Sequence, residues 1–242
     1  MNFVLLDVIF TGKCKTNLLP GQIVLIIMKS TRERRRQVIR SVALLHTLSK
    51  REGITSVYGF AEKYDALVSP IHLTQGQGKN GWQALFNGTR PVSATRLRAL
   101  STVHAWSDAI DLFENGPANL WKAMWGPSEQ LRLVIADELT EWRNFDRAVA
   151  EFERELLLAQ KYHAPLAFMH LAKAIAFCRL QNEILGLGDA SLSYGVAQCL
   201  CNEVLQEDME CLGVRPAINE ELVEFFSTKD NYELSSSSIA AR

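Results

Sequence analysis

The spacing of large apolar residues between Leu131 and Leu156 constrains the fold more than any other feature of the sequence. Successive members are three or four residues apart: Leu131, Ile135, Leu139, Trp142, Phe145, Val149, Phe152 and Leu156. An α-helix turns once in 3.6 residues, so this spacing returns to one face of a helix, whereas a strand needs a period of two. The sequence therefore predicts one long amphipathic helix over 131–156, with its acidic residues facing outward.

Shorter patterns of the same kind predict helices along most of the remaining chain. Ser, Thr, Gly and Pro residues stand at the ends of these patterns, where helices begin and stop. The expected helices cover about 30–51, 55–67, 82–87, 93–103, 107–114, 165–185, 192–212 and 218–227. The expected fold class is therefore all-α, with a helix-turn-helix-like N-terminal domain followed by an acidic helical bundle.

Residues 1–28 differ from this helical pattern. The runs Phe3–Phe10 and Gln22–Ile27 are rich in β-branched and aliphatic residues, and the breaker cluster Asn17–Gly21 separates them. This pattern predicts a short β-hairpin at the extreme N-terminus. An upstream extension of a core that begins near Met28 fits the same residues, so both interpretations stay open.

Charge is segregated along the chain, although the formal net charge is only −1. Residues 29–104 carry 13 Lys or Arg against 4 Asp or Glu, and residues 105–242 carry 11 against 22. We therefore expect a basic domain over 29–104, a helical bundle over 105–230 for interaction or dimerisation, and a disordered tail over 231–242. Such asymmetry favours a polyanionic partner for the basic half, and the alternative is attraction between the two domains themselves.

The cysteines and the first residues indicate the expected compartment. An odd number of cysteines without framework spacing suits reduced thiols better than a secreted disulfide scaffold. They are Cys14, Cys178, Cys199, Cys201 and Cys211. The apolar start of the chain contains Asp7 and has no basic leader, which argues against a signal peptide or a membrane span. We expect a cytoplasmic protein that makes no membrane contact.

The segment from Trp82 to Leu97 contains Gly88-Thr89-Arg90-Pro91-Val92-Ser93 between two expected helices. It resembles the end of the third helix, the turn and the fourth helix of the Cro/C1-type (XRE) helix-turn-helix family. Members of that family often read Gly-x-Arg/Lys-x-Pro-Ser-x-x-x-Leu there, whereas Val92 separates the Pro from the Ser in this chain. The loop over 69–81 is also longer than the usual turn between the second and third helices.

The resemblance implies that Gly81–Asn87 is a recognition helix that enters the major groove of duplex DNA. Lys79, Asn80 and Gln83 would then contact base edges, and nearby arginines and Thr89 would contact phosphates. The expected nucleic-acid-binding residues are Arg34, Arg35, Arg36, Arg40, Lys79, Asn80, Gln83, Thr89, Arg90 and Arg96. The function this implies is transcriptional regulation by a homodimer that associates through its C-terminal helices, with the 131–156 helix as the candidate interface. The alternative is a non-enzymatic helical adaptor subunit of a larger, nucleoprotein or protein assembly.

No pattern in the sequence predicts an active site, a cofactor or a metal centre. His163 and His170 are seven residues apart, too far along a helix axis to share an ion, and no C-x-x-C or H-E-x-x-H occurs. Gly186-Leu-Gly188 and Gly76-Gln-Gly78 lack the rest of a nucleotide-binding motif. We therefore expect a protein that is not an enzyme.

Overall fold

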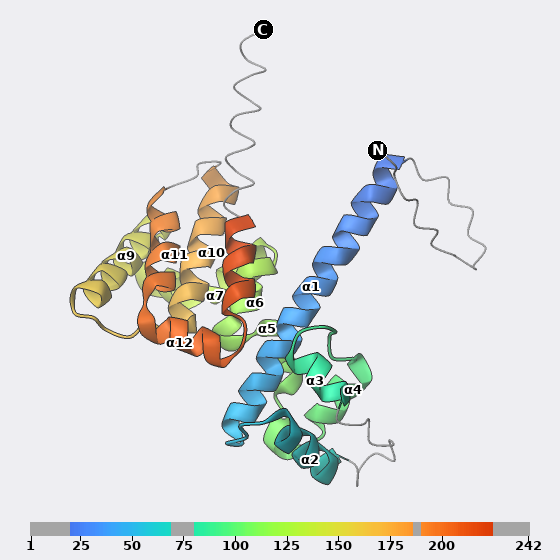
Figure 1. Ribbon diagram of the computed structural model, residues 1–242. Helices are drawn as coiled ribbons and strands as arrows, with labels where there is room; N and C mark the ends of the chain where they lie inside the picture. The colour runs from blue at the N-terminus through green and yellow to red at the C-terminus, as the bar shows by residue number, and fades with distance from the viewer. Residues whose placement is uncertain (1–19, 69–79, 186–189, 225–242) are drawn as a thin grey trace, which may run out of the picture. The chain divides into compact units, whose positions relative to one another are not determined.

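The computed structural model describes residues 20–68, 80–185 and 190–224, and within these ranges it contains helices and no strand (Figure 1). The α-helices are α1 Pro20–Arg51, α2 Val57–Val68, α3 Asn80–Phe86, α4 Ala94–Ser101, α5 Ala109–Asn115, α6 Leu120–Trp125, α7 Ser128–Val134, α8 Ala136–Trp142, α9 Phe145–Lys161, α10 Phe168–Leu185, α11 Ala190–Cys201 and α12 Glu203–Cys211. Two 3₁₀ turns, η1 His104–Trp106 and η2 Pro117–Asn119, join some of them, and a further helix covers 215–224. The predicted all-α class is confirmed for the described residues.

The chain divides into two units, Met1–Arg35 and Arg36–Arg242. The second unit contains two hydrophobic cores. The smaller core, which we call the aromatic core, is built from the C-terminal part of α1 and from α2 to α5. Phe60 at its centre stacks on Trp106, with ring centroids 5.5 Å apart, and meets Trp82 edge-on at 5.1 Å.

The larger core, which we call the bundle core, is centred on α10. This helix packs against α6, α7 and α11, and α9 packs in turn against α8 and α11. Apolar side chains cover α10 on nearly all sides, as expected of a helix that its neighbours surround. Its buried residues are Leu171, Ala172, Ala174, Ile175, Ala176, Phe177, Cys178 and Leu180.

The part of α1 that belongs to the second unit contributes to both cores. Ile39 and Val42 pack in the bundle core, whereas Leu45 and Leu48 are fully buried in the aromatic core. One amphipathic stripe cannot serve two cores, so this helix is apolar on two of its faces. Both the aromatic core and the bundle core therefore include residues of α1.

The prediction of one long helix over 131–156 is wrong. Three helices, α7, α8 and α9, cover this range, because Ile135 leaves helical geometry at φ −111° and ψ 20° and Arg143 adopts the left-handed conformation at φ 52°. Asn144 then caps α9 by accepting a hydrogen bond from the Arg147 amide at 3.2 Å. The period identified the core-facing residues correctly, because all eight lie in or against the bundle core.

A capping asparagine also divides the helix predicted over 192–212. Asn202 lies between α11 and α12, and its side chain caps α12 by accepting from the Leu205 amide at 3.2 Å. Asn and Asp side chains compete with the backbone for hydrogen bonds, which favours helix ends over helix interiors. Apolar periodicity carries no information on this competition, so it predicts helices over 131–156 and 192–212 that are too long.

The prediction of a strand over 22–27, as the second arm of an N-terminal hairpin, is also wrong, because these residues are helical within α1. Pro20 occupies the first turn of α1, where its fixed φ and missing N–H are tolerated. Extending an existing helix costs far less than nucleating one, so the strong helix that follows overrides the β-branched preference of this run. The first arm, Phe3–Phe10, lies outside the described residues.

None of the described helices combines the length and the apolar character that crossing a bilayer requires.

Candidate functional site

The turn after α3 has the geometry of a Schellman motif. Gly88 takes the left-handed conformation at φ 68°, which a residue without Cβ adopts freely. The Thr89 amide donates to the Ala84 carbonyl at 2.9 Å, and the Gly88 amide donates to the Leu85 carbonyl at 3.3 Å. The Thr89 hydroxyl donates to the same Ala84 carbonyl at 2.8 Å, so Thr89 closes the end of α3.

Two contacts hold this turn against α1. A Cβ on Gly88 would lie 3.3 Å from a methyl group of Val38, which shows how closely the turn backbone approaches the helix. The Val92 amide donates to the hydroxyl of the fully buried Ser41 at 2.8 Å, and that hydroxyl donates to the Gln37 carbonyl at 2.7 Å. Val92, the residue that separates Pro from Ser here, is therefore an anchor of the turn.

The helix α3 has one buried face and one exposed face. Trp82, Leu85 and Phe86 are buried in the aromatic core. Gln83 and Asn87 are exposed, one turn apart, and the Gln83 Nε2 donates to the Asn87 Oδ1 at 3.0 Å. The exposed face of α3 thus presents a bonded pair of amides.

Two arginines lie near the first turn of α3. Arg90 is exposed, and its Nη2 donates to the Gly81 carbonyl at 3.0 Å. The guanidinium of Arg96 lies over the Trp82 ring, 4.4 Å from its centroid. Burial lowers the pKa of Arg96, Tyr64 raises it and the positive charge of Arg90 lowers it further. Arg96 is therefore part of the packing around Trp82, and Arg90 is the cation that faces water.

The structure does not bring Arg36 and Arg40 to the exposed face of α3. Their guanidinium carbons lie 5.4 Å and 5.3 Å from the centroid of the Trp125 ring on α6. Trp125 also donates its indole N–H to the buried Glu221 carboxylate at 3.1 Å and stacks on Trp121 at 5.0 Å. These two arginines belong to a cation–π cluster beside the bundle core.

Four of the residues predicted to bind nucleic acid remain, and the structure describes three of them. Arg34 is exposed on α1 and Arg35 is partly buried, and both belong to the first unit. Asn80 begins α3. Lys79 lies outside the described residues. Of the ten predicted residues, five therefore lie on α3, its turn or the start of α4: Asn80, Gln83, Thr89, Arg90 and Arg96.

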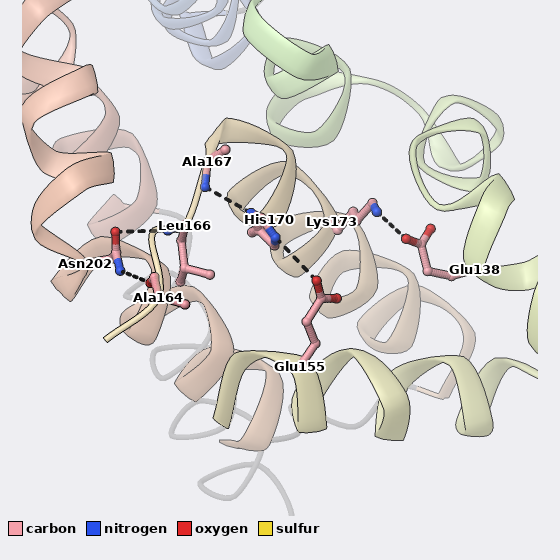
Figure 2. A network of polar contacts seen from close by, with 8 residues as sticks. All are labelled: Glu138, Glu155, Ala164, Leu166, Ala167, His170, Lys173 and Asn202. Carbon is pink, nitrogen blue, oxygen red and sulfur yellow. Dashed lines mark hydrogen bonds and ion pairs between the residues drawn. The ribbon is translucent and has the colours of Figure 1, made fainter. Parts of the chain in front are cut away.

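A second polar site, which sequence reasoning missed, joins α9, α10 and the junction between α11 and α12 (Figure 2). His170 is the third residue of α10, and its Nδ1 accepts from the Ala167 amide at 2.9 Å. Its Nε2 lies 3.4 Å from the Glu155 carboxylate on α9. The imidazole therefore takes the capping-box position that Glu or Gln usually occupies, and it also links two helices.

Asn202 holds the loop between α9 and α10 in place. Its Nδ2 donates to the Ala164 carbonyl at 3.2 Å, and its Oδ1 accepts from the Leu166 amide at 3.2 Å, in addition to the cap on Leu205 (Figure 2). Nearby, Lys173 forms a largely buried ion pair with Glu138 between α10 and α8. The sequence signal for Asn202 was an Asn followed by Glu203 inside an apparently continuous helix, a typical N-terminal capping pattern.

A pocket of about 290 Å³ opens beside Asn202. His163, which takes the left-handed conformation at φ 51°, lines it together with Gln160, Gln198, Cys201 and Glu203. The buried Cys199 nearby has its pKa raised to about 12 by burial, with a smaller contribution from Glu155, so its thiol is inert at neutral pH. Within the described ranges, no three His, Cys, Asp or Glu side chains converge so as to hold a metal ion.

No protein-family model, curated protein or solved structure matches this chain.

Proposed function

We propose that the chain binds duplex DNA through α3 and its turn, and that it regulates transcription as a homodimer formed through C-terminal helices. The observation that carries this proposal is the exposed amide pair of Gln83 and Asn87, with Arg90 beside it, on a helix fixed to α1. A base-reading element needs polar side chains on a rigid support. The Schellman turn and the Ser41 bond to Val92 supply that rigidity.

The amide pair matches the major-groove edge of adenine. The bond between Gln83 Nε2 and Asn87 Oδ1 leaves Gln83 Oε1 as an acceptor and Asn87 Nδ2 as a donor. Adenine presents one donor, N6–H, and one acceptor, N7, in the major groove. The pair can therefore bond one adenine bidentately without losing its internal hydrogen bond.

The charge around this face suits a polyanion. Arg90 is exposed at the turn, and Arg98 is exposed on α4. Phosphate contacts from such residues fix the position of a protein on DNA, and base contacts supply specificity. We assign the phosphate contacts to Arg90 and Arg98, because Arg36 and Arg40 are engaged on Trp125.

The test is fluorescence anisotropy with random and genome-derived duplexes at two salt concentrations. Replacing Arg90 by Ala should weaken binding to every duplex and lower the slope of log K against log salt by about 1. The Gln83→Ala variant should lose about 1–3 kcal/mol of binding free energy on a preferred duplex and little on random DNA. Arg132→Ala, which removes an exposed arginine from α7, is the matched control and should bind as the wild type does.

Two results would overturn the proposal. One is the absence of duplex binding at low salt, which would favour the adaptor function instead. The other is equal loss of affinity in Arg90→Ala and Arg132→Ala, because it would show that only total charge matters.

A further inference from the structure

Exposed apolar side chains gather on α9 and the elements beside it. Five large apolar residues in this region have side chains about half exposed or more: Leu157, Leu158, Tyr162, Met169 and Tyr194. Leu157 and Tyr194 line one groove, and Leu158 and Tyr162 line another. Large apolar residues exposed singly are ordinary, whereas neighbouring ones mark an interaction surface. This region is therefore the strongest candidate for a contact with another molecule.

The outer face of α9 combines apolar and basic residues. Phe152 and Leu156 face the bundle core, and Leu157 lies one residue further round the helix, 54% exposed. Arg154 precedes Leu157 by three residues and Lys161 follows it by four, so all three share one face. We call Arg154, Leu157 and Lys161 the ridge.

A groove of about 100 Å³ runs beside the ridge, between α9 and α11. Its lining is mainly apolar: Leu156, Leu157, Tyr194 and Gly195, with Gln198. Glu153 is the charged residue of this lining. Its Oε1 is buried, and no donor among the described residues lies within hydrogen-bonding distance of it.

The apolar lining and the Glu153 carboxylate together indicate which chemical groups the groove can bind. Burial of one carboxylate oxygen without a donor leaves the charge of Glu153 poorly compensated, so a partner that brings a cation beside this carboxylate is favoured. The rest of the groove fits an apolar side chain. The ridge of α9 itself carries this pair of groups, an apolar Leu157 with the cation of Lys161 one turn away.

We propose that two copies of the chain pair through α9, antiparallel and centred on Leu157. Glu153 and Lys161 each lie four residues from Leu157, which is about 6 Å along the helix axis. An antiparallel pair with this centre puts Lys161 of each copy level with Glu153 of the other. A two-fold axis makes the contact twice, as in most homodimers.

This inference deepens the proposed function by naming the surface through which the proposed homodimer would form. Two copies would present two α3 helices to two half-sites on DNA. The contacts that carry the inference lie on α9 and α11 alone, and its test contains no DNA. A failure of DNA binding therefore leaves the result of this test unaffected, and a chain that stays monomeric still presents one α3 helix to a half-site.

The first experiment is sedimentation equilibrium of the full chain without DNA. Leu157→Glu puts a charge at the centre of the contact and should raise the dimer dissociation constant by about 30-fold or more, as expected for a central interface residue. Leu133→Glu is the matched control, because Leu133 is 69% exposed on α7 and does not line the groove between α9 and α11. It should change the constant by less than about threefold.

A charge exchange then tests the register. Glu153→Lys and Lys161→Glu should each weaken the dimer by about tenfold, and the double variant should return to within about threefold of the wild type. Circular dichroism of each variant verifies that it is folded. A wild type that stays monomeric at about 100 µM, or a double variant at least as weak as either single one, would overturn the proposal.

Discussion

Gly116, between α5 and η2, offers a quantitative test of how tightly this chain packs around its tryptophans. Its backbone lies at φ 74° and ψ −178°, a region that residues with a side chain essentially do not adopt. A Cβ at this position would lie 2.6 Å from Cδ1 and Nε1 of Trp121 and 2.7 Å from its Cδ2. Trp121 is itself buried in the bundle core and stacks on Trp125, so it has little room to move.

Replacing Gly116 by Ala should lower the free energy of unfolding by about 4 kcal/mol, the centre of a range of about 2–6 kcal/mol. Backbone strain in this region contributes about 1–3 kcal/mol. Overpacking against a fixed ring adds a further 1–3 kcal/mol or so. For a chain of this size, about 2–4 °C of Tm corresponds to 1 kcal/mol, so the central value of about 4 kcal/mol should lower Tm by roughly 8–16 °C.

Gly53 provides the matched control. It also has a positive φ, 65°, but a Cβ there would meet no atom within 4 Å. Gly53→Ala should therefore show only the left-handed penalty of about 1–2 kcal/mol, reduced by about 0.4–1 kcal/mol through the stiffer unfolded chain. Urea unfolding of the two variants measures the difference, and a Gly116→Ala variant within about 1 kcal/mol of Gly53→Ala would refute the packing argument.

Three further predictions concern single side chains. Asn202→Ala should lower the free energy of unfolding in urea by about 2–4 kcal/mol, because it removes a helix cap and two bonds to the loop. Asn202→Ser retains a helix cap and should lower it by less; equal losses in the two variants would show that the cap contributes nothing. Burial lowers the pKa of His46 below 6.5 despite its bond to a backbone carbonyl. As pH falls, the imidazole of His46 is therefore protonated at higher pH in the unfolded chain than in the folded chain. The free energy of unfolding that the neutral imidazole contributes is present above about pH 6.5 and is lost as pH falls below it. His46→Gln should weaken this dependence in urea titrations at pH 7.5 and 5.5, and an unchanged dependence would contradict the assignment. Iodoacetamide should label the exposed Cys201 and Cys211 of the native protein well before Cys199, as mass spectrometry of timed samples would show, and early labelling at Cys199 would contradict its burial.

The candidate site at α3 was predictable in part. The turn residues from Gly88 to Ser93 indicated a helix end, a turn and a capped helix, and Ser93 does cap α4 by accepting from the Arg96 amide at 3.3 Å. The roles of the arginines were not predictable from position alone. Whether a guanidinium faces water, as Arg90 does, or covers an indole ring, as Arg40 does, depends on residues far away in the sequence.

Local patterns determined which residues of this chain face a core. The three- and four-residue spacing predicted helices and their buried faces, because helix geometry depends only on neighbours along the chain. The breaks at Arg143 and Asn202 escaped the pattern, because a capping side chain competes with helix continuation without changing the apolar period.

Tertiary structure decided how these helices share their surfaces. Apolar periodicity and charge indicated an all-α chain of amphipathic helices with a basic and an acidic half. Only packing decided that α1 would serve both cores, that Asn202 would pin the loop between α9 and α10, and that Leu157 would stay exposed beside an unsatisfied carboxylate. The physical reason is range: hydrogen bonds within a helix join residues four apart, whereas burial depends on which distant segments meet.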